Sequence, residues 1–333
     1  MDRESEPEPQ SDADHEVLGW PDEVDEIFRG DLTVAVGMPT PKGGVALASV
    51  TPIGLRDREA GTVGFTSSLG FGRKLERIAA DPRIAMLYHT REHGFTARPG
   101  LVLVQGVATI QSEFTPQERE AIRQRAGEHL GQVVEGKFWD WWLATYYEDR
   151  VVVNIRARRV LWWPDGDTAE APEVFGAPLP AEAPRDQRGA AEMTRARVPM
   201  TKVERGLRHS HRILGVLQDD GLPLLLPFEV GHIGDEAVEA KVGSPLLPTG
   251  ERRAGVLAHD FRAKLIGLST ATHTGWLRVG DEGAWWTPHT RHAFAAPPNK
   301  TLLLLANGAA ARWGYRQAIK QGRDEIVRHA TAS

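Results

Sequence analysis

The chain has 333 residues, a net charge of −5 and a pI near 6.2, which is enough for two domains and argues against a nucleic-acid partner. It has no cysteine, so disulfides, thiolate catalysis, iron–sulfur clusters and Cys-ligated zinc are excluded. Residues 1–16 are acidic and Pro-rich and lack the basic and apolar regions of a signal peptide. No apolar run reaches the ~20 residues of a membrane span. We therefore expect a cytoplasmic protein with a disordered tail over 1–16 and without membrane or nucleic-acid partners.

The first compact region is predicted to span residues 17–164 and to be mainly β. Helices are expected at 71–80, where Asp81-Pro82 ends the pattern, and at 115–130, where Thr115-Pro116-Gln117-Glu118 is a capping box with Pro at the first helical position. The aromatic-dense segment 137–147 is a third predicted helix. Short apolar segments bounded by turn residues predict strands at 31–36, 45–53, 62–67, 84–89, 101–110 and 150–163.

A second compact region is predicted at 201–333, after a linker at 165–200 that is rich in Pro, Ala and Gly. A closing helix is expected from about 309 to 329. Strands are predicted at 212–217, 222–230, 236–242, 253–260, 264–270, 274–279, 284–288 and 300–305.

The two regions share a rhythm of strand, polar Gly/Pro turn and strand. The segment LTVAVGMPTPKGGVALASV in the first resembles RILGVLQDDGLPLLLPFEV in the second, and RIAMLYHT resembles RAGVLAHDF. This similarity indicates a degenerate internal duplication. Short strands at regular intervals with few helices then predict two β-barrels or sandwiches in tandem.

The segment TSSLGFGRK, from Thr66 to Lys74, gathers the residues of an anion site where a strand becomes a helix. A helix N-terminus offers free N–H groups and the positive end of the helix dipole. The hydroxyls of Thr66, Ser67 and Ser68, the flexible glycines and the cations Arg73 and Lys74 add donors and charge. The segment therefore favours a phosphate site, although an ordinary N-cap and a solvated basic face explain the same residues.

The order of motifs in residues 30–164 resembles the pyridoxamine 5′-phosphate oxidase-like superfamily, the FMN-binding split barrels that include deazaflavin-dependent reductases. A Thr/Ser-rich strand end leads to the basic pair Arg73-Lys74, then to a helix ending in Asp81-Pro82. A strand follows, and then the V-x-G-x-A strand Val104-Gln105-Gly106-Val107-Ala108. The resemblance implies tandem split β-barrels with flanking helices, the second copy being degenerate. The chain lacks the Arg-containing tail of true pyridoxamine phosphate oxidases, so vitamin B6 oxidation is not assigned.

The resemblance also implies a cofactor site. The phosphate of FMN would lie against Thr66, Ser67, Ser68, Arg73 and Lys74, and its ring near Val50 and Thr51. The implied function is hydride transfer to a small-molecule substrate, for which no catalytic side chain is assigned. The relatives usually bind the cofactor between two barrels of a dimer, so a monomer with an internal pseudo-dimer or a homodimer is expected.

Two alternatives remain open at the sequence level. The cofactor could be the deazaflavin F-420, because a phosphate site serves either cofactor. The protein could instead be a non-catalytic carrier of flavin or haem. His273, His289 and His292 could line a substrate or haem pocket, although packing at a barrel rim explains them as well. No metal site is predicted, because His89 and His93 do not converge in an extended segment. The aromatic residues of 137–147, such as Trp139 and Trp142, could pack on the barrel or form a wall for a planar ligand.

Overall fold

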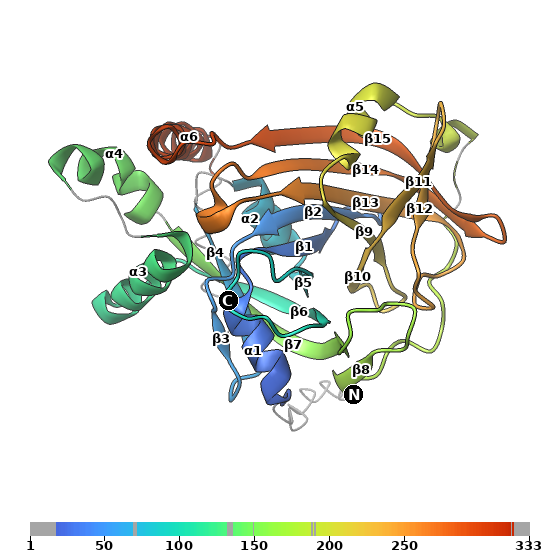
Figure 1. Cartoon of the computed structure of the whole chain (residues 1–333), viewed down its shortest axis with the longest axis horizontal. Coiled ribbons are helices and arrows are strands. Elements are labelled where there is room, and N and C mark those ends of the chain that lie inside the picture. Colours follow the sequence, from blue (N-terminus) through green and yellow to red (C-terminus); the bar gives the residue numbers. More distant parts are fainter. Residues whose placement is uncertain are drawn as a thin grey trace, which may run out of the picture.

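The computed structural model describes residues 18–68, 72–131, 136–148, 150–187, 189, 191–320 and 322. The predicted tail at 1–16 lies outside these residues. Two curled antiparallel sheets with flanking helices make up the molecule, and one half of the chain forms each sheet (Figure 1). The fold is thus the predicted tandem of split β-barrels.

The first sheet contains eight strands in the order β2-β1-β5-β6-β7-β4-β3, with β8 paired to β7. Strand β8 lies in the predicted linker, so part of 165–200 joins the first sheet. The strands are β1 (Val34–Pro39), β2 (Val45–Val50), β3 (Arg56–Asp57), β4 (Thr62–Ser68), β5 (Arg83–Tyr88), β6 (Leu101–Gln111), β7 (Arg150–Trp163) and β8 (Glu173–Gly176).

The second sheet contains seven strands in the order β10-β9-β13-β14-β15-β12-β11. This is the order of the first sheet, strand for strand, when β9 to β15 take the places of β1 to β7. The strands are β9 (His211–Leu217), β10 (Pro223–Pro227), β11 (Glu229–Ile233), β12 (Val238–Lys241), β13 (Gly250–Asp260), β14 (Ser269–Gly280) and β15 (Gly283–Ala295).

A matching β-bulge shows that the repeat extends to single residues. The pairing of β6 with β7 shifts between Gln105 and Gly106, and that of β14 with β15 shifts between Thr274 and Gly275. A Cβ on Gly106 would lie 2.0 Å from the carbonyl oxygen of Arg156, and one on Gly275 would lie 2.1 Å from that of Thr287. The same local geometry therefore requires glycine at the same place in both halves.

The helices lie on the outside of the sheets. Figure 1 shows α3, α4 and α6 gathered at one end of the molecule, and α5 lying over the second sheet. Helix α3 begins with the predicted capping box, in which Thr115 Oγ1 accepts a hydrogen bond from Glu118 N. The α-helices are α1 (Asp22–Gly30), α2 (Gly72–Ala80), α3 (Pro116–Leu130), α4 (Lys137–Glu148), α5 (Met200–Leu207) and α6 (Lys300–Lys320). None of the described helices is long and apolar enough to cross a membrane.

Two sequence-based assignments were wrong in the second half. Residues 300–305, predicted as a strand, form the first turns of α6, because leucine favours helices and Asn299 Oδ1 accepts hydrogen bonds from the N–H groups of Thr301 and Leu302. The segment 264–270 was predicted as one strand, but β14 begins at Ser269. Before it lies the short 3₁₀ helix η3 (Ala263–Leu265), in which Lys264 and Leu265 have φ values of 60° and 57°.

One apolar cluster joins the two halves. It combines Leu47, Leu87 and Leu103 of the first sheet with Leu225 and Leu257 of the second. Because apolar burial supplies most of the free energy of folding, the two halves stabilise each other through this cluster.

Buried polar pairs cross the same interface. Arg159, of which 1% is exposed, contacts Asp220 at 2.6 Å, and Gln105 Nε2 donates to Gln218 Oε1 at 2.7 Å. His89 and His259 occupy equivalent places at the ends of β5 and β13, and their Nε2 atoms lie 2.9 Å apart. A residue that meets its own counterpart lies at the pseudo-twofold axis, so His89 and His259 mark that axis.

Candidate functional site

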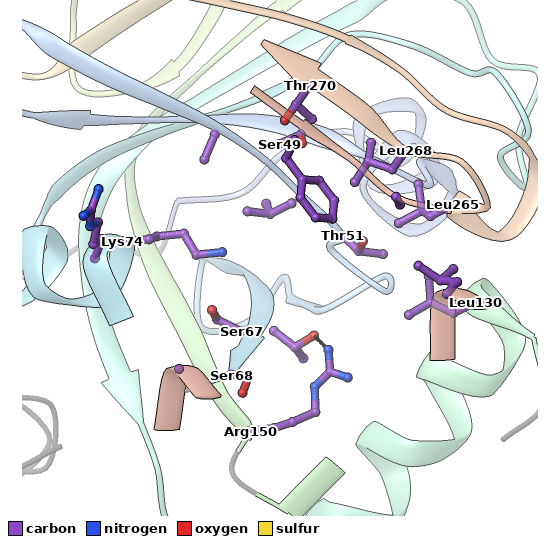
Figure 2. A pocket seen from close by; sticks show the side chains of 18 of the residues that line it. Ser49, Thr51, Ser67, Ser68, Lys74, Leu130, Arg150, Leu265, Leu268 and Thr270 are labelled. Carbon is purple, nitrogen blue, oxygen red and sulfur yellow. Dashed lines mark hydrogen bonds between the residues drawn. The ribbon is translucent and has the colours of Figure 1, made fainter. Parts of the chain in front are cut away.

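A pocket of about 880 Å³, here called the main pocket, lies between the two halves (Figure 2). This volume is at the upper end of the range for small-molecule sites. The main pocket brings together every site residue predicted from the sequence: Val50, Thr51, Thr66, Ser67, Ser68, Arg73 and Lys74. They come from the end of β2, the end of β4 and the first turn of α2.

The lining of the main pocket is strongly basic. No aspartate or glutamate occurs among its described lining residues, whereas six of them are basic: Arg73, Lys74, Arg77, Arg150, Lys264 and Lys300. Cations that lie close together repel each other, and an anion that enters the pocket relieves this repulsion. The charge pattern is therefore that of a site for an anionic ligand.

Lys74 is a partly buried cation at this end of the main pocket. Its ammonium lies 5.4 Å from the centre of the Phe65 ring, and no carboxylate in the described part of the chain pairs with it. Burial, with a further contribution from the nearby charge of Arg150, lowers the pKa of Lys74 to about 8. Because a partly buried ammonium loses hydration without gaining a counter-charge, an anionic ligand beside Lys74 would stabilise its charged form.

Arg150 was not predicted as a site residue, and the pairing of β4 with β7 brings it there. Arg150 lies opposite Ser68 in that ladder, and its Nη2 donates to Thr66 Oγ1 at 3.1 Å. Figure 2 shows Arg150, Ser67 and Ser68 grouped on one side of the main pocket. In the sequence, Arg150 is recognisable only as the first residue of a predicted strand. Which strand it pairs with is a long-range property, so the local pattern could not place Arg150 in the site.

Ser67 provides an independent sign of a ligand. Only 4% of this residue is exposed, and its hydroxyl oxygen has no hydrogen-bond partner in the described structure. Buried hydroxyls nearly always have partners, so a ligand acceptor that meets Ser67 would complete the site. A phosphate fits, since its oxygens accept hydrogen bonds and carry negative charge that Lys74 and Arg150 attract.

The second half builds the opposite wall of the main pocket. Figure 2 shows Leu265 and Leu268 near Thr51, and Thr270 near Ser49. This half was predicted to be a degenerate partner, and none of its residues was predicted to line the site. Its lining residues come from η3 and the segment after it, from β14, from β15 with the residue just beyond it, and from α6: Lys264, Leu265, Ile266, Leu268, Thr270, Thr272, Phe294, Ala296, Lys300, Leu303, Leu304, Trp313, Gly314 and Gln317.

The internal repeat places a second pocket, here called the mate pocket, at the equivalent position. It has a volume of about 620 Å³, and the ends of β10 and β12 line it as the ends of β2 and β4 line the main pocket. By the register of the two sheets, Lys241, Val242 and Gly243 take the places of Thr66, Ser67 and Ser68. No helix is found between β12 and β13, so the mate pocket lacks a counterpart of α2.

The sequence candidates outside this site have other roles. His89 lines the mate pocket and contacts His259, while His93 lies near Glu92 and the Phe261 ring. His273 is buried edge-on against Trp286. None of the described side chains of α4 lines the main pocket, and Trp142 Nε1 donates to Leu305 O of α6. A wall for a planar ligand at 137–147 stays a prediction.

The N-terminal part of the chain is similar to solved structures of pyridoxamine phosphate oxidase-like proteins. The expected resemblance is thus found at the level of the fold. A Clostridium acetobutylicum protein related to general stress protein 26, of the pyridoxinephosphate oxidase family, is 11% identical with a TM-score of 0.31, and the match covers 46% of this chain and 92% of that one. General Stress Protein 26 from Bacillus anthracis is 10% identical with a TM-score of 0.32, over 46% and 96% of the two chains.

A solved F420 reductase is also similar to this chain, at 15% identity and a TM-score of 0.29, over 41% of this chain and 94% of that one. No family model matches the chain, and no curated protein matches it. These similarities concern the fold, and the nature of the site rests on the residues described above.

Proposed function

We propose that the chain binds the phosphorylated flavin cofactor FMN in the main pocket and is an oxidoreductase that acts on a small molecule. The single observation that carries this proposal is the convergence of Ser67, Lys74 and Arg150, an unpaired buried hydroxyl and two cations, beside an apolar wall. A phosphate matches the basic end of the pocket, and a planar ring system matches its apolar wall.

In this proposal the residues of the chain bind and orient the cofactor. Ser67, Lys74 and Arg150 hold the phosphate, and Thr66, Ser68 and Arg73 complete the basic end. Val50 and Thr51 at the end of β2 lie along the ring, and the second half covers it and excludes water. The cofactor, when bound, supplies the hydride chemistry, and the protein supplies its orientation.

The deazaflavin F-420 is the alternative cofactor, and one observation favours it. Arg73 and Arg77 are exposed residues of α2 that line the main pocket. They add cations beyond those needed for one phosphate, and the side chain of F-420 carries carboxylates in addition to its phosphate. A non-catalytic carrier of flavin or haem is the remaining alternative, and a failure to turn over with a reduced nicotinamide donor or reduced F-420 would favour it.

The absorption spectrum of the purified chain, with mass spectrometry of what it releases on denaturation, tests the proposal directly. Flavin bands and an FMN mass would support it, a deazaflavin mass would select F-420, and a Soret band would select haem. A colourless chain that takes up none of the three when they are added would overturn it.

A charge-removing variant tests the site itself. We expect Lys74→Ala to weaken FMN binding by roughly tenfold to a hundredfold, since a hydrogen bond to a charged group contributes about 1.5–3 kcal/mol. Lys202→Ala is the matched control, because Lys202 is an exposed lysine of α5 outside the main pocket. Equal affinities in the two variants, measured by quenching of FMN fluorescence, would place the phosphate elsewhere.

Because residues from both halves of one chain line the main pocket, we propose that the functional unit is a monomer with an internal pseudo-dimer. We expect light scattering to give the molar mass of one chain. We also expect each chain to bind one cofactor.

A further inference from the structure

The internal repeat allows the residues that line the main pocket to be compared with the equivalent residues of the other half. Three positions of the second half can be compared with their equivalents in the first: Thr270 with Leu101, Thr272 with Leu103, and Phe294 with Trp163. Leu101, Leu103 and Trp163 are 4%, 0% and 1% exposed and belong to the shared apolar cluster. These three side chains pack in the core and do not line the mate pocket.

Their counterparts Thr270, Thr272 and Phe294 line the main pocket instead. Phe294 is 54% exposed, although its counterpart Trp163 is buried. Trp313 of α6, which also lines the main pocket, is 69% exposed, and α6 has no counterpart after β7 in the described part of the first half. Large apolar side chains that stay exposed in a pocket mark a binding surface for an apolar ligand.

The loop before β14 completes this wall. Leu265 points into the main pocket near Thr51 (Figure 2), and it lies in the left-handed region with φ of 57°, directly after Lys264 at 60°. Two consecutive residues with side chains in this region are costly, and such strain is tolerated where the surrounding structure fixes a functional contact. The loop thus holds an apolar side chain over the place proposed for the cofactor ring.

From these observations we propose that the substrate is a planar, apolar molecule that binds against Leu265, Phe294 and Trp313, on the second-half side of the main pocket. This inference rests on the proposed function and adds the chemical class of the substrate. The phosphate end and the apolar wall belong to different halves of the chain, so one pocket accommodates an anionic cofactor and an uncharged aromatic partner side by side.

The inference is tested with 1-naphthol and phenol, which differ by one fused apolar ring. Equilibrium dialysis measures the affinity of the full chain for each, with and without added FMN. We expect 1-naphthol to bind at least tenfold more tightly than phenol. We also expect Phe294→Ser and Trp313→Ser each to weaken its binding about fivefold to tenfold, because each removes apolar area from the wall. Both side chains are more than half exposed, so these variants should fold.

Phe138→Ser is the matched control, since Phe138 of α4 is 53% exposed and does not line the main pocket. Equal binding of 1-naphthol and phenol, or 1-naphthol binding that changes equally in the control and the wall variants, would overturn the inference. The two proposals fail separately. If FMN does not bind but 1-naphthol binds and responds to Phe294→Ser, the apolar site stands and the cofactor assignment falls; if FMN binds and 1-naphthol does not, the substrate class falls alone.

Discussion

In the proposed function, Lys74 gives the main pocket an affinity for anions that depends on its protonation. Its pKa without ligand is about 8, and an anion beside the ammonium stabilises the charged form and raises this value. Below pH 8 the lysine is protonated with and without ligand, so pH has no effect through this group. Above pH 8 Lys74 loses its proton in the unbound protein. Ligand binding must then be accompanied by proton uptake, so the affinity falls as the pH rises.

We therefore expect FMN affinity to be level from pH 7 to 8 and to fall by up to about tenfold per pH unit above it. Fluorescence titrations from pH 7 to 9.5 measure this dependence. In Lys74→Arg the guanidinium stays charged throughout, so its affinity should be level over the same range. A decline of equal steepness in Lys74→Arg would mean that another group controls binding.

At the scale of elements, the paired β-bulges fix the curl of both sheets. We expect Gly275→Ala to destabilise the chain by about 3 kcal/mol, because the new Cβ would lie 2.1 Å from the Thr287 carbonyl oxygen and the backbone would have to move. Urea unfolding measures this loss. Gly280→Ala in the same strand, where a Cβ would meet nothing within 4 Å, should change stability little, and a similar loss in both variants would contradict the role of the bulge.

The elements that the sequence predicted best were those with a local signal. The capping box gave the start of α3, and the repeat of LTVAV and RILGV predicted two sheets that proved to share one strand order. The wall from the second half was not predicted, because Thr270, Phe294 and Trp313 are far from Lys74 in sequence and have no motif of their own. The run at 300–305 was assigned as a strand because a short apolar run does not distinguish a strand from a buried helix.

At the scale of the whole molecule, the histidines on the pseudo-twofold axis make the joined halves sensitive to acid. Burial lowers the pKa of His89 to about 3 and that of His259 to about 2, and the neighbouring His211 contributes to both shifts. In the unfolded chain a histidine has a pKa near 6.5. Between pH 6.5 and about 3 the unfolded chain thus binds more protons, so stability falls as the pH falls.

We expect the free energy of unfolding to decrease below pH 6.5 by up to about 1.4 kcal/mol per pH unit for each of these two histidines. Urea titrations at pH 7.5, 6.5 and 5.5 measure it. The double variant His89→Leu with His259→Leu should show a weaker dependence, whereas His292→Gln, at an exposed position, should keep that of the original chain. An unchanged slope in the double variant would show that other groups cause the acid sensitivity.

The joining of both walls of the main pocket in one chain has a consequence for dilution. In a pocket built by two separate subunits, dissociation of the subunits at low concentration also releases the ligand, so retention depends on how much protein is present. Here a covalent connection holds the walls together, and the effective concentration of one half near the other does not fall on dilution. The half-life for release of the bound ligand should then be the same at nanomolar and micromolar concentrations of the protein.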